Sequence, residues 1–192
     1  MDELIDKFAA AQEDDGYLYT ARTIDPDNVP EACGPKRWSN LAVNHELYNV
    51  GHMYEAAVAY FQATGKRSFL DIAIRNADLI DSVFGPEKLR DVPGHQEIEI
   101  GLVALYRITG DARYLRLARF FLDERGQENG RQVYGHYCQD HQPVTEQREA
   151  VGHAVRAGYM YAAMTDIAGL NENPDKAAAE NGREGKEAGR RR

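Results

Sequence analysis

The sequence predicts an all-α fold built from stacked helical hairpins, and three observations support this prediction. The segment that begins at Thr64-Gly65 recurs 45 residues later at Thr109-Gly110, and apolar residues precede and follow both turns. Apolar residues recur at helical spacing through most of the chain, and no segment alternates as a strand would. A repeat of this length indicates hairpins that bury their apolar faces against neighbours, in an open solenoid or a closed ring.

The first expected elements are a short helix and a long loop. Residues 2–14 predict an amphipathic helix, because Leu4, Ile5 and Phe8 share one face and the Asp-Asp-Gly sequence at 14–16 stops it. Residues 17–38 are rich in Pro, Gly and Asp with scattered aromatic residues, which is typical of a long ordered loop. Loops of this length in compact domains are often functional.

Five longer helices should follow. A helix is expected from Ser39 or Asn40, either of which could cap it, to residue 64. Gly-Pro at 85–86 ends the next, and Pro-Gly at 93–94 precedes the third. The second of these helices is expected over residues 68–84, the third from after residue 94 to 108, and the fourth over 111–122. A polar segment should separate the fourth from the fifth, which is expected over 144–170.

We expect one domain over residues 1–170 and a polar tail over residues 171–192. The 43% hydrophobic content is sufficient for a core. Residues 171–192 contain no aromatic residue and no Leu, Ile, Val or Met, so they cannot bury enough apolar surface to offset the entropy of ordering. The tail is therefore expected to be disordered or a frayed helix.

Composition and charge limit the classes of function and the cellular compartments that are expected for this chain. A net charge of −8 argues against a nucleic-acid partner, although three arginines end the chain. No apolar run is long enough to cross a membrane, and the first residues lack the features of a signal peptide, so a cytoplasmic location is expected. Cys33 and Cys138 are far apart in sequence and without C-x-x-C spacing, which favours free thiols.

Three histidines occupy similar positions in the expected helices. His45, His95 and His153 each lie near the start of a long helix, and in stacked hairpins such ends meet at a shared mouth. A single histidine at a helix start more often caps the helix or faces water, but recurrence in successive hairpins favours one pocket. His52 follows His45 by about two turns and could extend that pocket, although a satisfied core histidine is the favoured interpretation.

The sequence predicts no metal site in this chain. His45, Glu46 and His52 do not form the H-E-x-x-H pattern of zinc proteases. Residues 134–141 hold two histidines, a cysteine and an aspartate, but without a known ligand spacing. This segment could instead contain an Asp–His pair that orients a substrate contact, or be a plain structured loop.

The carboxylates do not reveal a catalytic pair. Glu97 and Glu99 are two residues apart and should point to different sides of a helix. Other acids are expected to be solvated or to cap helices, namely Glu46, Glu55, Glu146 and Glu149.

Taken in order, the motifs resemble the β-L-arabinofuranosidase family of glycoside hydrolases, family 127. The matching strings are Asp-Gly-Tyr-Leu at 15–18, His-Glu-Leu-Tyr at 45–48, Pro-Gly-His-Gln-Glu at 93–97 and Gly-His-Ala-Val-Arg at 152–156. This resemblance implies a partial (α/α)6 barrel of the six-hairpin glycosidase type, incomplete at both ends. It also implies exo-acting, retaining hydrolysis of terminal β-L-arabinofuranosides or related plant glycans.

The resemblance also implies roles for particular residues. His45, His95 and His153 match positions that contact arabinose in the family, and His141 and Gln96 are weaker substrate-binding candidates. In the complete family enzyme a zinc-bound cysteine thiolate is the nucleophile and a glutamate the general acid/base, both in the later part of the barrel. Cys33 and Cys138 lie in the wrong segments for that site, so no catalytic residue and no bound zinc are expected in this chain.

Two function classes therefore remain open. The first is a fragment of a glycoside hydrolase that contacts carbohydrate and is inactive alone. The alternative is a helical-hairpin repeat module that binds a partner without catalysis, and convergence of the three histidines would favour the first. In either case, apolar faces of the helices expected at 2–14 and 144–170 are candidates for self-association.

Overall fold

The computed structural model describes residues 1–172, and the predicted all-α class is confirmed for this part of the chain. The longer helices are α1 (Asp2–Ala11), α3 (Glu46–Thr64), α4 (Ser68–Val83), α5 (Ile98–Thr109), α6 (Ala112–Glu124) and α7 (Ala154–Glu172). Short helical turns are α2 (Thr20–Thr23), η1 (Glu31–Cys33) and η2 (His136–Cys138). The tail expected over residues 171–192 lies, apart from the end of α7, outside the described residues.

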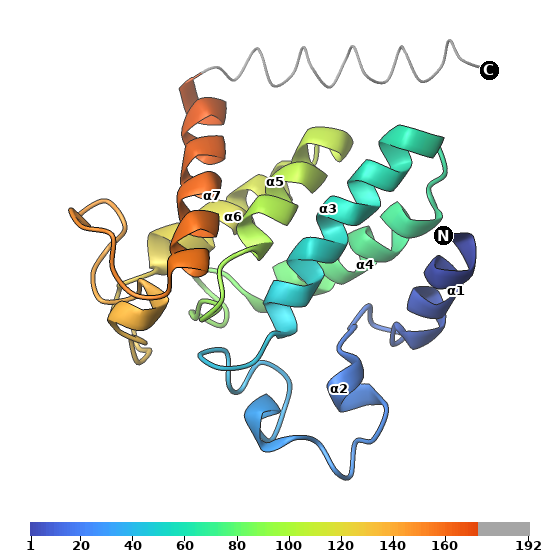
Figure 1. Cartoon of the computed structure of the whole chain (residues 1–192), viewed down its shortest axis with the longest axis horizontal. Coiled ribbons are helices and arrows are strands. Elements are labelled where there is room, and N and C mark those ends of the chain that lie inside the picture. The colour runs from blue at the N-terminus through green and yellow to red at the C-terminus, as the bar shows by residue number, and fades with distance from the viewer. Residues whose placement is uncertain (173–192) are drawn as a thin grey trace.

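The helices form two rows. Helix α5 packs between α3 and α7 in one row, while α4 and α6 pack against each other behind α3 and α5 (Figure 1). Helix α1 covers part of α4. In this arrangement α3, α5 and α7 begin on the same side of their row. A site can form there from three segments that are far apart in the sequence.

The repeated turn has the same structure in both copies. Gly65 and Gly110 adopt the left-handed conformation, with φ of 71° and 74°, and end α3 and α5. The preceding threonine accepts a hydrogen bond from the second following backbone N–H and donates to the carbonyl four residues before it in each copy. Glycine suits this position because a left-handed residue with a side chain is strained.

Two glycines allow α3 and α5 to approach closely. A Cβ on Gly51 would lie 2.7 Å from the backbone nitrogen of Ile98, and one on Gly101 would lie 2.5 Å from the carbonyl oxygen of Gly51. Leu47, Tyr54 and other buried side chains fill the space on either side of this contact. The close approach brings the turn of α3 around Gly51 against the first residues of α5.

Helix α3 begins at Glu46, several residues later than predicted. The expected start at residue 39 or 40 is wrong because Glu46 is buried and accepts hydrogen bonds from the backbone N–H of Trp38 at 3.0 Å and the side chain of Asn44 at 2.6 Å. Tyr17 also donates to this carboxylate. The expectation that Glu46 is solvated or only caps a helix is therefore also wrong.

The starts of α5 and α7 were placed too early as well. Helix α5 begins at Ile98, because Glu97 has an extended φ of 168° and the side chain of Gln96 is held by Cys138 and Gln139. Helix α7 begins at Ala154, ten residues after the expected start. Gln139 donates to the carbonyls of Val151 and His153, which holds this approach as a loop.

The first helix and the following loop are close to expectation. Helix α1 ends at Ala11, since the side chain of Gln12 donates to the carbonyls of Gly16 and Ile72 instead of continuing the helix. Residues 17–38 form the predicted ordered loop, which contains α2 and η1. Cys33 and Cys138 are free, as predicted, and both are buried.

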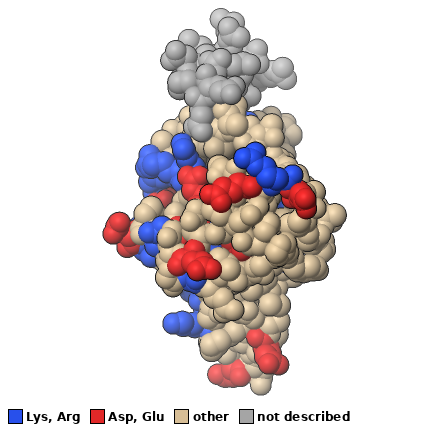
Figure 2. Space-filling model, turned by 90° about the vertical axis from the view of Figure 1, so that its left-hand side faces the viewer, with Lys and Arg blue, Asp and Glu red and all other residues tan. Residues whose placement is uncertain are grey.

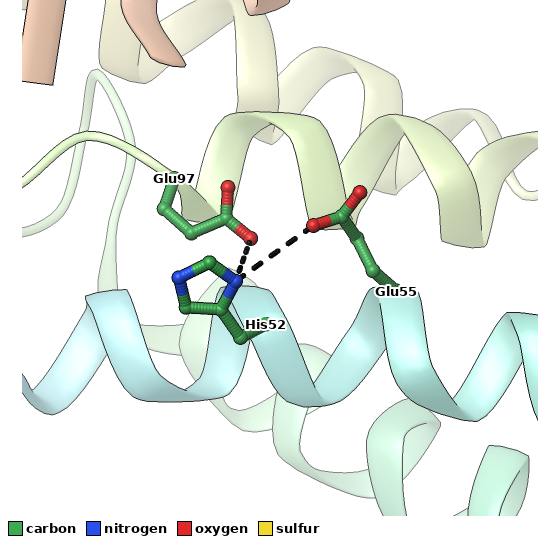
Figure 3. A group of neighbouring side chains, drawn as sticks. All are labelled: His52, Glu55 and Glu97. Atoms are coloured by element: carbon green, nitrogen blue, oxygen red, sulfur yellow. Dashed lines mark ion pairs between the residues drawn. The ribbon is translucent and has the colours of Figure 1, made fainter. Parts of the chain in front are cut away.

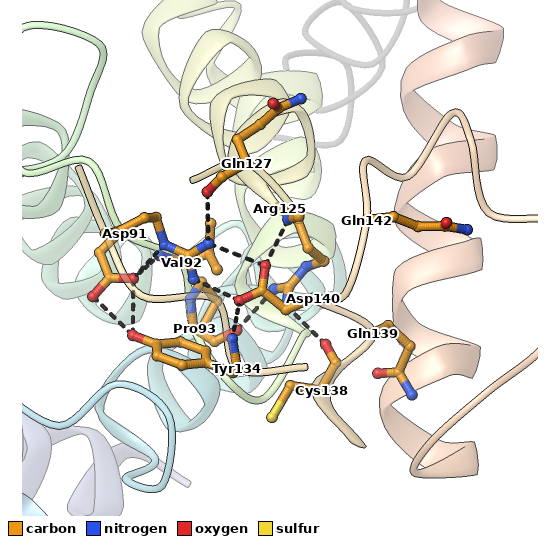
Figure 4. A network of polar contacts seen from close by, with 12 residues as sticks. Asp91, Val92, Pro93, Arg125, Gln127, Tyr134, Cys138, Gln139, Asp140 and Gln142 are labelled. Carbon is orange, nitrogen blue, oxygen red and sulfur yellow. Dashed lines mark hydrogen bonds and ion pairs between the residues drawn. The ribbon is translucent and has the colours of Figure 1, made fainter. Parts of the chain in front are cut away.

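A buried polar network holds the loop between α6 and α7. The carboxylate of Asp140 accepts hydrogen bonds from the backbone of Gly126 and Tyr134 and from the guanidinium of Arg131 (Figure 4). Asp91 accepts from Arg131 and from the hydroxyl of Tyr134. Asp140 therefore does not pair with a histidine, and the structured-loop interpretation of residues 134–141 is the correct one.

The surface mixes charges and apolar residues. Acidic and basic side chains alternate on the face seen in Figure 2, and neither sign forms a continuous patch there. Among the described residues no helix is both long and apolar enough to span a bilayer. Leu4 of α1 and Val155 and Tyr161 of α7 are exposed, and self-association through these helices stays a prediction.

Candidate functional site

Three histidines lie just before the first residues of helices α3, α5 and α7. His45 immediately precedes α3, His153 immediately precedes α7, and His95 lies three residues before α5. His45 makes no capping hydrogen bond, so its ring is available for other contacts. His45 is exposed, and His95 and His153 are half-buried.

His45 and His95 are in direct contact. Their ring centroids lie 4.0 Å apart with the planes tilted by 35°. Nη2 of Arg156, in the first turn of α7, lies 2.6 Å from Nε2 of His95. Because a guanidinium can only donate, Nε2 must be the acceptor and the proton of neutral His95 must lie on Nδ1.

The surroundings keep this imidazole pair neutral near pH 7. Partial burial, the positive charge of Arg156 and the adjacent His45 lower the pKa of His95 to about 4. Partial burial and Arg156 also lower the pKa of His45. Neutral imidazoles both donate and accept hydrogen bonds, which suits them to contact hydroxyl groups.

His153 joins the group through Tyr137 and Arg156. The rings of Tyr137 and His153 meet edge to face with centroids 5.5 Å apart, and the guanidinium of Arg156 lies 4.8 Å from the centre of the Tyr137 ring. The backbone of His153 donates to the carbonyl of Tyr137 at 3.1 Å. His153 is thus linked to the His45–His95 pair through Tyr137 and Arg156, and a pocket lined by all three histidines stays a prediction.

The lowered pKa values predict a stability loss in acid. A neutral histidine whose native pKa lies below that of the unfolded chain stabilises the fold above about pH 6.5, and this contribution is lost as the pH falls towards the native pKa. We expect histidine NMR signals to titrate with a pKa of about 4 for His95 and below the ordinary value for His45. His95→Gln should reduce the loss of stability between pH 6.5 and 4, and ordinary titration of His95 near pH 6.5 would contradict the burial argument.

The two weaker candidates lie elsewhere. Gln96 is fully buried, and its amide donates to the carbonyl of Cys138 at 2.8 Å and the side chain of Gln139 at 3.0 Å. It thus supports the loop behind the histidines and does not line an open surface. His141 stacks on His136 with centroids 4.2 Å apart, in the loop that follows α6.

A second polar group continues along the same face of α3. His52 is 41% exposed and its Nδ1 lies 3.1 Å from an oxygen of Glu97, so the expectation of a satisfied core histidine is wrong. Glu99 turns the other way, with an oxygen 3.5 Å from the buried Arg125. Glu97 and Glu99 therefore do point to different sides, as predicted.

Sequence reasoning missed the residues that join these groups. Arg156 carries the contact between α7 and His95, and its spacing of three residues from His153 on a helix could have indicated a shared face. Tyr48 packs edge to face against His52 at 4.6 Å and against His95 at 5.9 Å. Tyr159 of α7 completes this aromatic wall, 5.6 Å from His52.

The family follows from comparison with known proteins. The sequence matches the model described as "Beta-L-arabinofuranosidase, GH127 catalytic domain" over residues 1–181. The chain belongs to the GH127 β-L-arabinofuranosidase family. A curated relative of this GH127 chain, the non-reducing end β-L-arabinofuranosidase of Bifidobacterium longum subsp. longum, is 38% identical over 189 residues. That alignment includes 88% of this chain and 28% of the relative, so the chain spans about 28% of the relative's length.

Solved GH127 structures have the same helical arrangement. A structure titled as a GH127 β-arabinofuranosidase superposes with a TM-score of 0.84 at 49% identity, covering 93% of this chain and 28% of the other. A GH127 β-L-arabinofuranosidase from Geobacillus stearothermophilus T6 gives 0.78 at 43% identity, covering 95% and 30%. These matches confirm the expected six-hairpin glycosidase-like class. The GH127 chain forms an all-α part of that fold.

The cysteines of the GH127 chain do not fit the zinc site that the resemblance implies. Cys33 is buried at the end of η1, and its sulfur lies 3.8 Å from the hydroxyl of Tyr19. Cys138 is buried in η2 and receives a hydrogen bond from Arg156 at 2.9 Å. Among the described residues, the group of potential ligands close enough to hold a metal contains neither cysteine.

Proposed function

We propose that this chain forms the sugar-contacting wall of a retaining, exo-acting hydrolase for terminal β-L-arabinofuranosides or related plant glycans. The observation that carries this proposal is the contact between His45 and His95, with Arg156 donating to His95. These contacts join the segments at the starts of α3, α5 and α7 in a chain of the GH127 family. The named activity of the Bifidobacterium longum relative gives the substrate class.

The histidines would bind hydroxyl groups of the sugar. His45 is exposed and neutral near pH 7, so its ring can donate to one hydroxyl or accept from another. Arg156 occupies Nε2 of His95 and Nδ1 of that ring is buried, so His95 would hold the His45 ring in place and reach a hydroxyl only when the guanidinium of Arg156 moves away. Hydrogen bonds to sugar hydroxyls that strengthen in the transition state contribute to glycoside hydrolysis.

We further propose that the groups that cleave the bond come from parts of the enzyme outside this chain. Cleavage needs a proton donor for the leaving oxygen and a nucleophile on the other face of the sugar. Glu46 and Glu99 are buried and face Trp38 and Arg125 instead of the histidines. The resemblance assigns the thiolate, the zinc and the acid to a later part of the barrel, and the two cysteines of this chain do not meet that need.

The repeat-module alternative is less well supported. Such modules present a graded concave surface and do not require a neutral histidine pair beside a buried arginine. The family match also extends over nearly the whole chain. The cytoplasmic location and the lack of a nucleic-acid partner stay predictions.

Sugar binding by the chain itself tests the proposal. We expect methyl β-L-arabinofuranoside to bind weakly and to shift the imidazole NMR signals of His45 and His95, whereas methyl β-D-glucopyranoside should shift them much less. Signals of His136, which is exposed and stacks on His141 instead of on the His45–His95 pair, serve as the internal control. Equal shifts with both sugars, or no shift at His45 and His95, would contradict the proposed wall.

A further inference from the structure

We propose that His52, Glu55 and Glu97 form a binding site for one divalent transition-metal ion, a site that is separate from the histidine pair and goes beyond the proposed function. Nδ1 of His52 lies 3.1 Å from Oε1 of Glu97 and 3.9 Å from Oε2 of Glu55. One ligand atom from each residue lies within 4.8 Å of the other two. In Figure 3 both carboxylates face the imidazole.

The helices hold these residues together. His52 and Glu55 are three residues apart on α3 and so share one face. Glu97 immediately precedes α5, at the point where Gly51 brings α3 against Ile98. The backbone contact between the two helices thus fixes Glu97, the last residue before α5, opposite His52.

The buried carboxylate of Glu97 is the independent observation that indicates a ligand. Its side chain is 0% exposed and neither oxygen accepts a hydrogen bond from the described residues; Nδ1 of His52, 3.1 Å from Oε1, forms an ion pair with it only when that imidazole is protonated. A buried polar group without a partner is costly, and a buried carboxylate more so. A cation between the three side chains would satisfy this carboxylate and remove its repulsion with Glu55.

The donor atoms favour a transition metal over magnesium. One imidazole nitrogen and two carboxylate oxygens suit zinc and its neighbours, whereas magnesium prefers oxygen and water. A tetrahedral zinc ion with bonds of about 2.0–2.1 Å would place its ligand atoms about 3.4 Å apart. The separations from His52 are 3.1 and 3.9 Å and that between the two carboxylates is at most 4.8 Å, so the half-exposed Glu55 side chain would have to move inward to bind the ion.

This set differs from the cysteine-containing zinc site of the complete family enzyme. It contains no sulfur, and three protein ligands leave a coordination position for water or another group. Tyr48 and Tyr159 pack against the His52 ring and limit its rotation, which keeps Nδ1 directed at the carboxylates.

Calorimetric titration of the untagged, chelator-treated 192-residue chain with zinc chloride tests the proposal. We expect one ion per chain, with affinity at least about tenfold weaker in His52→Gln and in Glu55→Gln, and much weaker binding of magnesium chloride. Both residues are partly exposed, so these variants should fold, and circular dichroism checks that they do. The matched controls His141→Gln and Glu146→Gln should bind as the original chain does.

Two other results would overturn the assignment. No zinc binding by the folded chain would mean that Glu97 is satisfied in another way, such as a proton shared with Glu55. Binding that survives in His52→Gln but is lost in His141→Gln would place the ion in the loop after α6. Cobalt substitution gives a second readout, because absorption from a thiolate-to-cobalt transition would assign the ion to a cysteine.

Discussion

Replacing Asp140 with alanine is expected to lower the free energy of unfolding by about 3–5 kcal/mol. The carboxylate is 0% exposed and accepts hydrogen bonds from Arg131 at 2.6 and 3.1 Å and from the backbone of Gly126 and Tyr134. Its removal leaves the buried Arg131 guanidinium with one acidic partner, Asp91, and leaves two backbone donors unpaired. Unfolding by urea, followed by circular dichroism, measures the loss.

A surface ion pair provides the control for this experiment. Asp123 pairs with Arg119 one turn away on α6, and both side chains are more than half exposed. Asp123→Ala should therefore change the unfolding free energy by less than about 1 kcal/mol. If the two aspartate variants lost similar amounts, the loop after α6 would not depend on the Asp140 network.

Replacing His95 with alanine in an active domain is expected to lower kcat/KM for an aryl β-L-arabinofuranoside about 100-fold. A suitable domain joins residues 1–170 of this chain to the matching remainder of the Bifidobacterium longum relative. We expect the loss because His95 packs against His45 and accepts from Arg156, so its removal leaves the proposed sugar-contacting ring of His45 unsupported and the guanidinium without its acceptor.

Two further variants distinguish the loss of a specific His95 contact from a general effect on folding. His136→Ala, in the exposed loop, should change kcat/KM by no more than about threefold. His95→Gln should recover part of the activity, since an amide can also donate and accept. Equal activity of His95→Ala and the unchanged domain would remove His95 from the proposed wall.

The hairpins could be predicted from sequence because their determinants are local. The Thr-Gly turns at 64–65 and 109–110 form the same hydrogen bonds in both copies, and each glycine supplies the left-handed residue that ends the helix. The helix starts were misplaced because distant contacts decide them. Glu46 begins α3 where its carboxylate reaches Trp38, a contact that no local pattern reveals.

The site could be predicted in part for the same reason. His45, His95 and His153 were recognisable because they recur near the starts of successive helices. His52 and Glu97 were misjudged or left apart because their proximity depends on how closely α3 and α5 approach at Gly51. Helical spacing relates residues on one helix, but it gives no distance between residues on two helices.

Hydrolysis of an aryl β-L-arabinofuranoside tests most directly whether this chain supplies sugar contacts without the groups that cleave the bond. We predict no detectable turnover by the 192-residue chain, with or without added zinc, and clear turnover by the domain completed from the Bifidobacterium longum relative. Hydrolysis by the chain alone, abolished by Cys138→Ser, would contradict this division and would make Cys138 a catalytic residue.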